Sequence, residues 1–406
     1  MCFLISQKEA SRVVPNWNVE TVFIVGAGHS HYAGLPLTSK FTDALLEARD
    51  YRQGPSRTLV EFLGLFIRDA FGHSSTAGAR YWPSLEDIFT CVDLSSNSGH
   101  HLGPNFAPAD LRTVRRALLA RTIRMLYRAY RDPSNRTAED WRQLKHFYSQ
   151  LDPARAGFIS MNWDTVVEQK LIGRNPELLF DYCCDAQSAA FPENATTIRP
   201  VAPLASRRDM DEATPIIKMH GSVNWLYCDN CRDLFWFHPD ETPRIAQQII
   251  RKDDLERISR FLNRRQRSVK RSATAHEAWN CFCSRQVSLG TRIATFSYQK
   301  ALDFPMFQKS WFSAERILQG ARTWAFIGYS LPPADYEFKY LLKRVQLARA
   351  KAPRFMVVSG GSEDDVKATY TNYQRFFGNT IKRQGPGTSF FSDGLSNEAI
   401  SKILTG

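Results

Sequence analysis

Thr21-Val22-Phe23-Ile24-Val25-Gly26-Ala27-Gly28-His29-Ser30 is the stretch of sequence that decides the fold. Its first half is apolar and β-branched, which predicts a buried strand, and its second half is a glycine turn that opens a helix. Glycines let the backbone turn sharply and approach a ligand closely, and the N–H groups that begin a helix can bind a phosphate. The stretch therefore predicts a parallel α/β sheet with an anion site at the end of its first strand.

The turn departs from the usual dinucleotide fingerprint at one position. That fingerprint, G-x-G-x-x-G, requires a third glycine where this chain has His31, and the next glycine begins Gly34-Leu35-Pro36. Taken alone, the turn is compatible with a nucleotide site and equally with a tight strand-to-helix turn that binds no ligand.

Two later segments repeat the pattern of a buried strand with polar residues at its exit. Residues 158–164 end in Asn162 and Asp164, and residues 216–225 contain His220 followed by a glycine. Because ligands of open α/β sheets bind beyond the carboxyl ends of the strands, we expect these three side chains to surround one ligand beside the glycine turn. The simpler alternatives are that the two acidic or amide residues cap a helix from about residue 165, and that the histidine is a buried structural residue.

Two strands near the C-terminus also run into glycines. Residues 323–327 lead into Gly328 and Ser330, and residues 354–358 lead into Ser359 and Gly360. The sequence thus predicts a doubly wound, parallel, Rossmann-like α/β sheet with a helical insertion and a smaller cysteine-bearing lobe. The expected parts are the start of the sheet domain at 1–39, a mainly helical insertion at 40–150, the sheet domain continued at 151–225, the cysteine-bearing lobe at 226–290, and the sheet domain completed with C-terminal helices at 291–406.

The composition is that of an ordinary globular protein. Of the 406 residues, 43% are hydrophobic and 23% are charged, which excludes a disordered chain. The apolar runs are far shorter than the 18 residues that mark a membrane helix, and the first residues are too short an apolar run for a secretory signal, so we expect a cytoplasmic protein without membrane contact. The net charge of +12 favours anionic partners without identifying them.

Four of the eight cysteines stand in two close pairs, Cys228-x-x-Cys231 and Cys281-x-Cys283. Each pair can supply half of a tetrahedral zinc site, and four thiolates leave no open position for a substrate, so such a zinc ion would be structural. The interval of roughly fifty residues between the pairs is longer than in common zinc ribbons. The sequence therefore predicts a candidate structural zinc site and leaves open whether zinc is bound.

Two groups of basic residues are candidates for contacts with acidic partners. The first is a stripe on a predicted helix at 111–131 and consists of Arg121, Arg124, Arg128 and Arg131. The second lies between the cysteine pairs and consists of Arg264, Arg265, Arg267, Lys270 and Arg271. A solvated surface is the simpler interpretation of both groups, and a contact with nucleic acid or with an acidic subunit is the alternative.

In combination, the motifs resemble those of the sirtuin family. Sirtuins have a Gly-Ala-Gly-x-Ser turn, a strand that ends in Asn-x-Asp, a His-Gly pair and then paired cysteines, and this chain has all four in that order. The likeness extends from about residue 22 to about residue 361, with long unmatched stretches between the motifs. Gly328-Tyr329-Ser330, with its continuation Leu331-Pro332-Pro333-Ala334-Asp335, looks like a segment of the sirtuin-like NAD hydrolases of bacterial defence, which the chain resembles more closely than it resembles the deacylases.

The resemblance implies an enzyme that hydrolyses NAD⁺, its substrate, to ADP-ribose and nicotinamide. It implies that Asn162 orients a ribose hydroxyl and a water, that Asp164 meets the nicotinamide carboxamide or the developing ribose cation, and that His220 is the general base. The ordinary pKa of histidine, near 6.5, suits that last role. The residues implied to bind NAD⁺ are Gly26, Ala27, Gly28, Ser30, Pro36, Gly328, Ser330, Ser359 and Gly360.

One departure from the deacylases bears on the reaction. Where deacylases continue the glycine turn with Gly-Ile-Pro-Asp-Phe-Arg, this chain has Gly34-Leu35-Pro36-Leu37-Thr38-Ser39. In deacylases the phenylalanine is thought to cover the cleaved ribose so that an acyl-lysine captures it, and without this shield water becomes the natural acceptor. The resemblance therefore favours hydrolysis, and the alternatives are a protein deacylase and a non-catalytic sensor of NAD⁺ or ADP-ribose.

The family resemblance also implies a biological setting, which is antiphage defence by depletion of NAD⁺. Uncontrolled loss of NAD⁺ is toxic, and the sequence contains no recognisable sensor domain. We therefore expect regulation through homo-oligomerisation or through an activating partner, either an ATPase or a nucleic-acid-guided protein.

Overall fold

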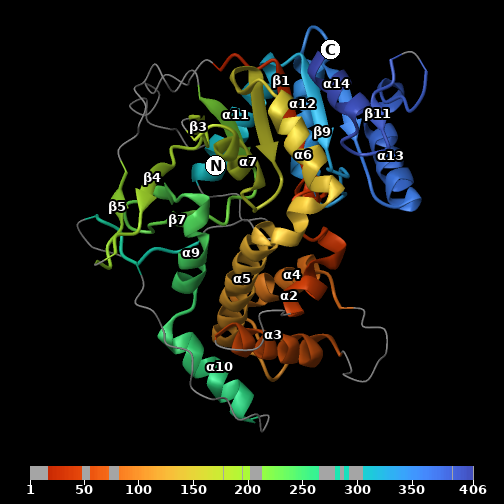
Figure 1. Ribbon diagram of the computed structural model, residues 1–406. Helices are drawn as coiled ribbons and strands as arrows, with labels where there is room; N and C mark the ends of the chain where they lie inside the picture. The colour runs from red at the N-terminus through yellow and green to blue at the C-terminus, as the bar shows by residue number, and fades with distance from the viewer. Residues whose placement is uncertain are drawn as a thin grey trace.

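A seven-stranded parallel sheet forms the centre of the molecule (Figure 1). The computed structural model describes residues 17–47, 55–72, 82–176, 178–193, 195–201, 213–264, 279–283, 288–291, 305–385 and 387–405. The strand order is β11-β10-β9-β1-β2-β6-β3, and each neighbouring pair is parallel. The strands are β1 (Thr21–Val25), β2 (Ala156–Ser160), β3 (Phe180–Asp181), β6 (Thr214–Lys218), β9 (Thr323–Ile327), β10 (Arg354–Val358) and β11 (Phe390–Phe391). The predicted doubly wound α/β fold is confirmed.

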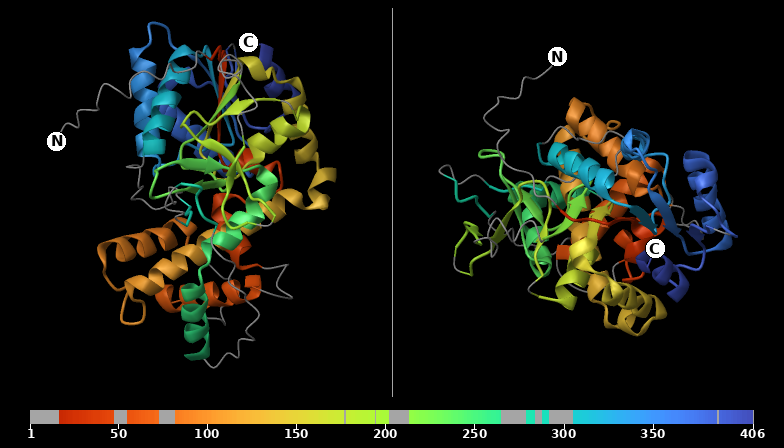
Figure 2. Two further views of the ribbon diagram at one scale, coloured as in Figure 1. Left: turned by 90° about the vertical axis from the view of Figure 1, so that its left-hand side faces the viewer. Right: turned by 90° about the horizontal axis from the view of Figure 1, so that it is seen from above.

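Helices cover both faces of this sheet, which explains why its central strands are mainly apolar rather than alternating between apolar and polar residues. Along β1, Phe23 and Val25 point into one core, and Val22 and Ile24 point into the other. The first core is closed by α6 (Glu139–Gln150), α7 (Val166–Arg174) and α14 (Asn397–Thr405). The second is closed by α11 (Pro305–Gly320), α12 (Tyr336–Ala348) and α13 (Glu363–Phe377). The left view of Figure 2 shows the two helical layers on opposite sides of the sheet.

The strand order reverses beside β1, which has β2 on one side and β9 on the other. The three strands are in register, with Thr21 opposite both Ala156 and Thr323. Their carboxyl ends consequently reach the same edge of the sheet together. Such a reversal point is where open α/β sheets bind their ligands.

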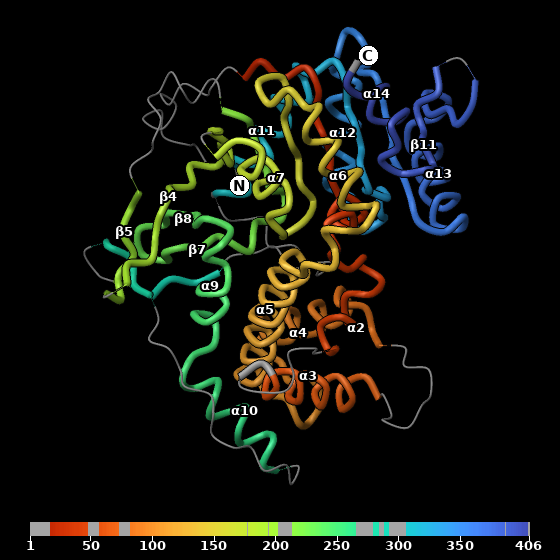
Figure 3. Tube along the Cα trace, in the orientation of Figure 1, coloured from red at the N-terminus to blue at the C-terminus, as the bar shows by residue number. Residues whose placement is uncertain are grey.

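A helical lobe extends from the sheet, as Figure 3 shows. It contains α2 (Phe41–Leu46), α3 (Pro55–Phe71), α4 (Leu85–Ser98) and α5 (Pro108–Arg131). Later helices complete it, because α9 (Thr242–Ile249) packs along α5, and α10 (Lys252–Arg264) packs against both α3 and α5. Residues 242–264, which the sequence placed in the cysteine-bearing lobe, thus help to bury the insertion.

The arginine stripe on α5 is exposed at Arg128 and Arg131 and buried at Arg121. Arg121 is only 2% exposed, and its Nε donates to the carbonyl oxygen of Leu45 at 3.0 Å, near the end of α2. Arg131 forms an ion pair with Asp240. The prediction of an exposed stripe is therefore wrong at Arg121, whose guanidinium holds two helices together. Of the second basic group, only Arg264 belongs to the described residues.

A smaller sheet carries the cysteine-bearing lobe. Its strands are β4 (Gln187–Ala190), β5 (Arg199–Pro200), β7 (Trp225–Tyr227) and β8 (Leu234–Trp236), in the order β5-β4-β8-β7. The short 3-10 turns are η1 (Thr38–Lys40), η2 (Pro133–Thr137), η3 (Pro153–Arg155), η4 (Pro239–Glu241) and η5 (Gly378–Thr380). Every helix within the described ranges is too short or too polar to serve as a bilayer span.

Candidate active site

The glycine turn after β1 interlocks with the exit of β9. The short helix α1 (Ala27–His31) begins directly after Gly26. Gly28 N–H donates to the carbonyl of Gly328 at 2.8 Å, and Gly26 N–H donates to the carbonyl of Ile327 at 3.2 Å. A Cβ on Gly28 would lie 2.7 Å from Gly328 Cα, so the close approach of the two backbones requires glycine. These two N–H groups therefore face carbonyl oxygens in the structure.

The side chains of Asn162 and Asp164, in the loop after β2, contact this turn. Asn162 Nδ2 donates to the carbonyl of Gly26 at 2.8 Å and to Ser30 Oγ at 2.9 Å. Ser30 Oγ in turn donates to Asp164 Oδ2 at 2.7 Å. The other carboxylate oxygen of Asp164 accepts the N–H of Val166 at 3.0 Å, at the start of α7. Asp164 thus accepts hydrogen bonds both from the first turn of α7 and from Ser30 of the glycine turn. The Asn162 amide group contacts the glycine turn and makes no such bond to α7 among the described residues.

His220 reaches the same edge from β6. Its Nδ1 lies 3.2 Å from the carbonyl oxygen of Met161, whose own N–H donates to the last residue of β1, Val25, at 3.0 Å. The imidazole is 5% exposed. The loops after β1, β2 and β6 therefore converge, which is the arrangement that a shared ligand requires.

Asp335 and Tyr329 complete this edge, and the sequence did not single out either as a site residue. His220 Nε2 lies 3.9 Å from Asp335 Oδ1, and Tyr329 Oη donates to Asp335 Oδ2 at 2.9 Å. The signal available in the sequence was an acidic residue a few positions beyond the β9 glycine. No sequence pattern shows that the chain turns back there and places this carboxylate near a histidine that lies 115 positions earlier.

The turn between β9 and Asp335 is strained. Leu331 has φ +54°, in the left-handed region that a bulky residue rarely adopts, and it is 1% exposed. Such a backbone costs about 1–3 kcal/mol and persists only where the surrounding structure enforces it. Here the enforcing contacts include Tyr373 Oη, which donates to the carbonyl of Tyr329 at 2.8 Å.

A buried ion pair supports the loop that carries Asp164. Lys218 and Glu168 are both 0% exposed, with Nζ and Oε1 3.5 Å apart. Lys218 Nζ also contacts the carbonyl oxygen of Asp164, and Tyr182 Oη donates to Glu168 Oε1 at 3.0 Å. Burial raises the pKa of Glu168, while the Lys218 ammonium acts in the opposite direction. The pair of Lys218 and Glu168 thus holds the Asp164 backbone in place through the contact of Lys218 Nζ with the Asp164 carbonyl oxygen.

His29 lies inside the glycine turn without reaching a ligand position. It is 0% exposed, and its Nε2 lies 3.0 Å from Tyr148 Oη on α6. Burial, aided by the charges of Lys170 and Lys218, lowers the pKa of His29 to about 3. The imidazole is therefore neutral at physiological pH and ties α1 to the helix that packs over it.

The remaining candidate residues line the same edge. Ser330 follows β9, and Ser359 and Gly360 follow β10, where Ser359 N–H donates to the carbonyl of Phe391 at 2.9 Å. Pro36 lies in the loop after α1. A concavity of about 830 Å³ lies between α13 and residues 379–392 and contains none of the candidate residues, so the chemistry at the sheet edge marks the site better than the size of a hollow does.

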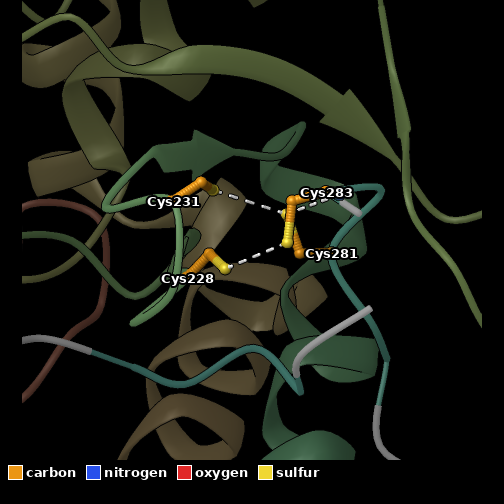
Figure 4. Close-up of side chains that lie close together, drawn as sticks. All are labelled: Cys228, Cys231, Cys281 and Cys283. Atoms are coloured by element: carbon orange, nitrogen blue, oxygen red, sulfur yellow. Dashed lines mark hydrogen bonds between the residues drawn. The ribbon is translucent and has the colours of Figure 1, made fainter. Parts of the chain in front are cut away.

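The four paired cysteines converge in the smaller lobe (Figure 4). Their Sγ atoms all lie within 4.8 Å of one another, at 3.9 Å for Cys228 and Cys283 and 3.7 Å for Cys231 and Cys281. Tetrahedral zinc with Zn–S bonds of about 2.3 Å separates its sulfurs by about 3.8 Å, whereas a disulfide needs about 2.05 Å. The donor set and its spacing therefore fit a structural zinc ion.

No family model matches the chain, and no curated protein matches it in sequence. Among solved structures, it is similar to a Sir2 homologue in complex with NAD, with 10% identity over 95% of this chain and 88% of the other and a TM-score of 0.31. It is also similar to a Sir2 mutant with a p53 peptide and NAD, with 13% identity, coverage of 91% and 98%, and a TM-score of 0.29. With TM-scores this low, the likeness carries no conclusion about function, which rests on the site itself.

Proposed function

We propose that the chain is a sirtuin-like NAD⁺ hydrolase, with the loops after β1, β2 and β6 as its active site. The observation that carries the proposal is the bonded network of Asn162, Ser30 and Asp164 on the glycine turn, with His220 beside it, at the point where the strand order reverses. A dinucleotide site at such a point, with an amide, a carboxylate and an imidazole around it, is suited to cleavage of a glycosidic bond.

The reaction needs little more than positioning, because nicotinamide leaves as a neutral molecule from a cationic ring. The C1′–N bond breaks and its electron pair goes to nicotinamide, while the oxygen of a water bonds to C1′. His220 takes the proton of that water and later releases it to solvent. Asn162 orients the ribose and the water, and Asp164 stabilises the positive charge that develops on the ribose. The residues proposed to hold NAD⁺ are Gly26, Ala27, Gly28, Ser30, Pro36, Gly328, Ser330, Ser359 and Gly360.

The closed state of the site supports regulated activity. His220 and Asp164 are 5% and 9% exposed, and the Asn162 amide is bonded to the glycine turn rather than presented to solvent. NAD⁺ would have to exchange these contacts for its own. We expect assembly of the chain into a homo-oligomer, or an ATPase or nucleic-acid-guided partner, to favour the open arrangement, in keeping with a role in antiphage defence.

The segment after the glycine turn favours water over an acyl-lysine as the acceptor. Leu37-Thr38-Ser39 stands where a deacylase would have Asp-Phe-Arg with its shielding phenylalanine, and Thr38 and Ser39 are exposed. A deacylase and a silent NAD⁺ sensor are the competing functions. Bound zinc at the four cysteines would hold the smaller lobe together and take no part in the reaction.

The decisive experiment is fluorimetry with etheno-NAD⁺ on the wild type, Asn162→Ala and His220→Ala, with the exposed Asn263→Ala and His146→Ala as matched controls. We expect hydrolysis that either site variant abolishes and neither control affects. Product that forms only with an acyl-lysine peptide would identify a deacylase. Tight binding of NAD⁺ without turnover, including in the presence of activating partners, would identify a sensor.

A further inference from the structure

The geometry points to Asp335 as a positioning residue that orients His220 and stabilises its protonated form, an inference that rests on the proposed hydrolase function. Asp335 stands at the start of α12, where an aspartate commonly caps the helix. Its side chain makes no capping hydrogen bond to α12. The carboxylate is instead 3.9 Å from His220 Nε2, so it faces the active-site edge.

The hydrogen bonds of His220 define which nitrogen can act. Nδ1 lies 3.2 Å from the carbonyl oxygen of Met161, which can only accept, so Nδ1 carries the proton of the neutral ring. Nε2 is then the basic nitrogen. Its distance of 3.9 Å from Asp335 Oδ1 is too long for a hydrogen bond, but the carboxylate lies close enough to attract the imidazolium that forms when the ring takes up a proton.

Asp335 is itself held firmly. Tyr329 Oη donates to Oδ2 at 2.9 Å, which leaves Oδ1 turned toward His220. Both Tyr329 and Asp335 are buried, at 5% and 8% exposure. The left-handed backbone at Leu331 returns the chain toward His220 after β9, and strained positions of this kind cluster at functional sites.

Two further charged groups of this edge, Asp164 and Lys218, have partners of their own. Asp164, after β2, accepts hydrogen bonds from Ser30 and Val166. Lys218, two positions before His220 on β6, is paired with Glu168 and contacts the Asp164 carbonyl. Asp335 lies 3.9 Å from His220 Nε2, so its charge acts directly on His220 when His220 removes a proton from the attacking water and passes it to solvent.

The test is Asp335→Asn, which keeps the acceptor for Tyr329 and removes the charge, with Glu337→Gln on the same helix as the control. We expect kcat for etheno-NAD⁺ to fall about 10- to 100-fold with little change in KM. The acid limb of the kcat/KM profile should move to lower pH, because the imidazolium loses its counter-charge. Tyr329→Phe keeps the charge and loses one orienting bond, so it should lower kcat less and leave the acid limb in place.

NMR titration of His220, one of nine histidines, tests the pairing without turnover. In Asp335→Asn, its titration midpoint should fall by about one pH unit relative to the wild type and to Glu337→Gln. A midpoint that does not move would overturn the inference whatever the enzyme does, and so would an Asp335→Asn enzyme whose kcat and pH profile match those of Glu337→Gln. If the wild type hydrolyses no NAD⁺ under activating conditions while the midpoint shifts as expected, the hydrolase function fails and the pairing stands.

Discussion

Removal of Lys218 should destabilise the whole molecule, because it breaks an ion pair that is closed to water on both sides. In Lys218→Met, Glu168 keeps its carboxylate in the interior with Tyr182 as a hydrogen-bond donor and no counter-ion. Loss of one partner from a buried pair costs about 3–5 kcal/mol. The variant also loses the contact with the Asp164 carbonyl, so the cost should fall at the upper end of that range.

Guanidinium unfolding followed by tryptophan fluorescence measures this cost. The matched control is Arg142→Met, which breaks the pair with Glu139 on the surface of α6, where both side chains are about two-thirds exposed. That pair should contribute less than about 0.5 kcal/mol. The double variant Lys218→Met/Glu168→Gln removes both charges and keeps an acceptor for Tyr182, so it should recover most of the lost free energy.

Two results would refute this reasoning. A loss below about 1 kcal/mol in Lys218→Met would mean that water reaches the pair, since that is the range of exposed ion pairs. A double variant no more stable than the single one would mean that the cost comes from lost packing rather than from the isolated charge.

Three further predictions concern the metal, the strand interlock and acid stability. Metal analysis by atomic emission should find one zinc per chain, and Cys228→Ser should lower that content and the melting temperature, whereas an unchanged zinc content would exclude this cluster as the site. Gly328→Ala places a Cβ 2.1 Å from His29 N at a φ of +59°, so it should lower the free energy of unfolding and abolish NAD⁺ binding measured by calorimetry. Normal binding would contradict the close backbone contact between Gly28 and Gly328 as a requirement of the site. The pKa of His29 is about 3 in the folded chain and about 6.5 in the unfolded chain, so protonation of this residue favours unfolding. The free energy of unfolding should therefore be highest above pH 6.5 and should fall by about 1.4 kcal/mol for each pH unit below it. His29→Gln should flatten that dependence in urea titrations at pH 5 and pH 7.

The parallel sheet could be predicted because its strands carry local signals. Runs such as Thr21–Val25 and Thr323–Ile327 are apolar, β-branched and followed by glycines, and strands covered on both faces leave this mark in any sequence. The helical lobe was less predictable. No local sequence signal predicts that α9 and α10 pack on α5 and α3 rather than on the cysteine-bearing lobe, because this packing depends on which apolar helix faces are complementary in shape.

The candidate site also contains some residues that the sequence predicts and others that it does not. Asn162, Asp164 and His220 were visible because polar residues at strand exits stand out from apolar runs. Asp335 was not, because its role depends on a turn at Leu331 that no residue preference favours. The burial of Arg121 could not be predicted for a related reason. Periodicity indicates that the arginines share one stripe of the helix, but not that a carbonyl oxygen of another helix accepts a hydrogen bond from one of them.

The contact between β1 and β9 also determines when the site can exist during synthesis. Thr21 pairs with Thr323, so during synthesis about three hundred residues follow the glycine turn before Gly328 is available to contact it. A chain released early, or cut before β9, lacks both that contact and Asp335. The loops after β1 and β2 therefore stand without their partner strand until β9 has been made, so the assembled edge of the sheet is a late product of synthesis.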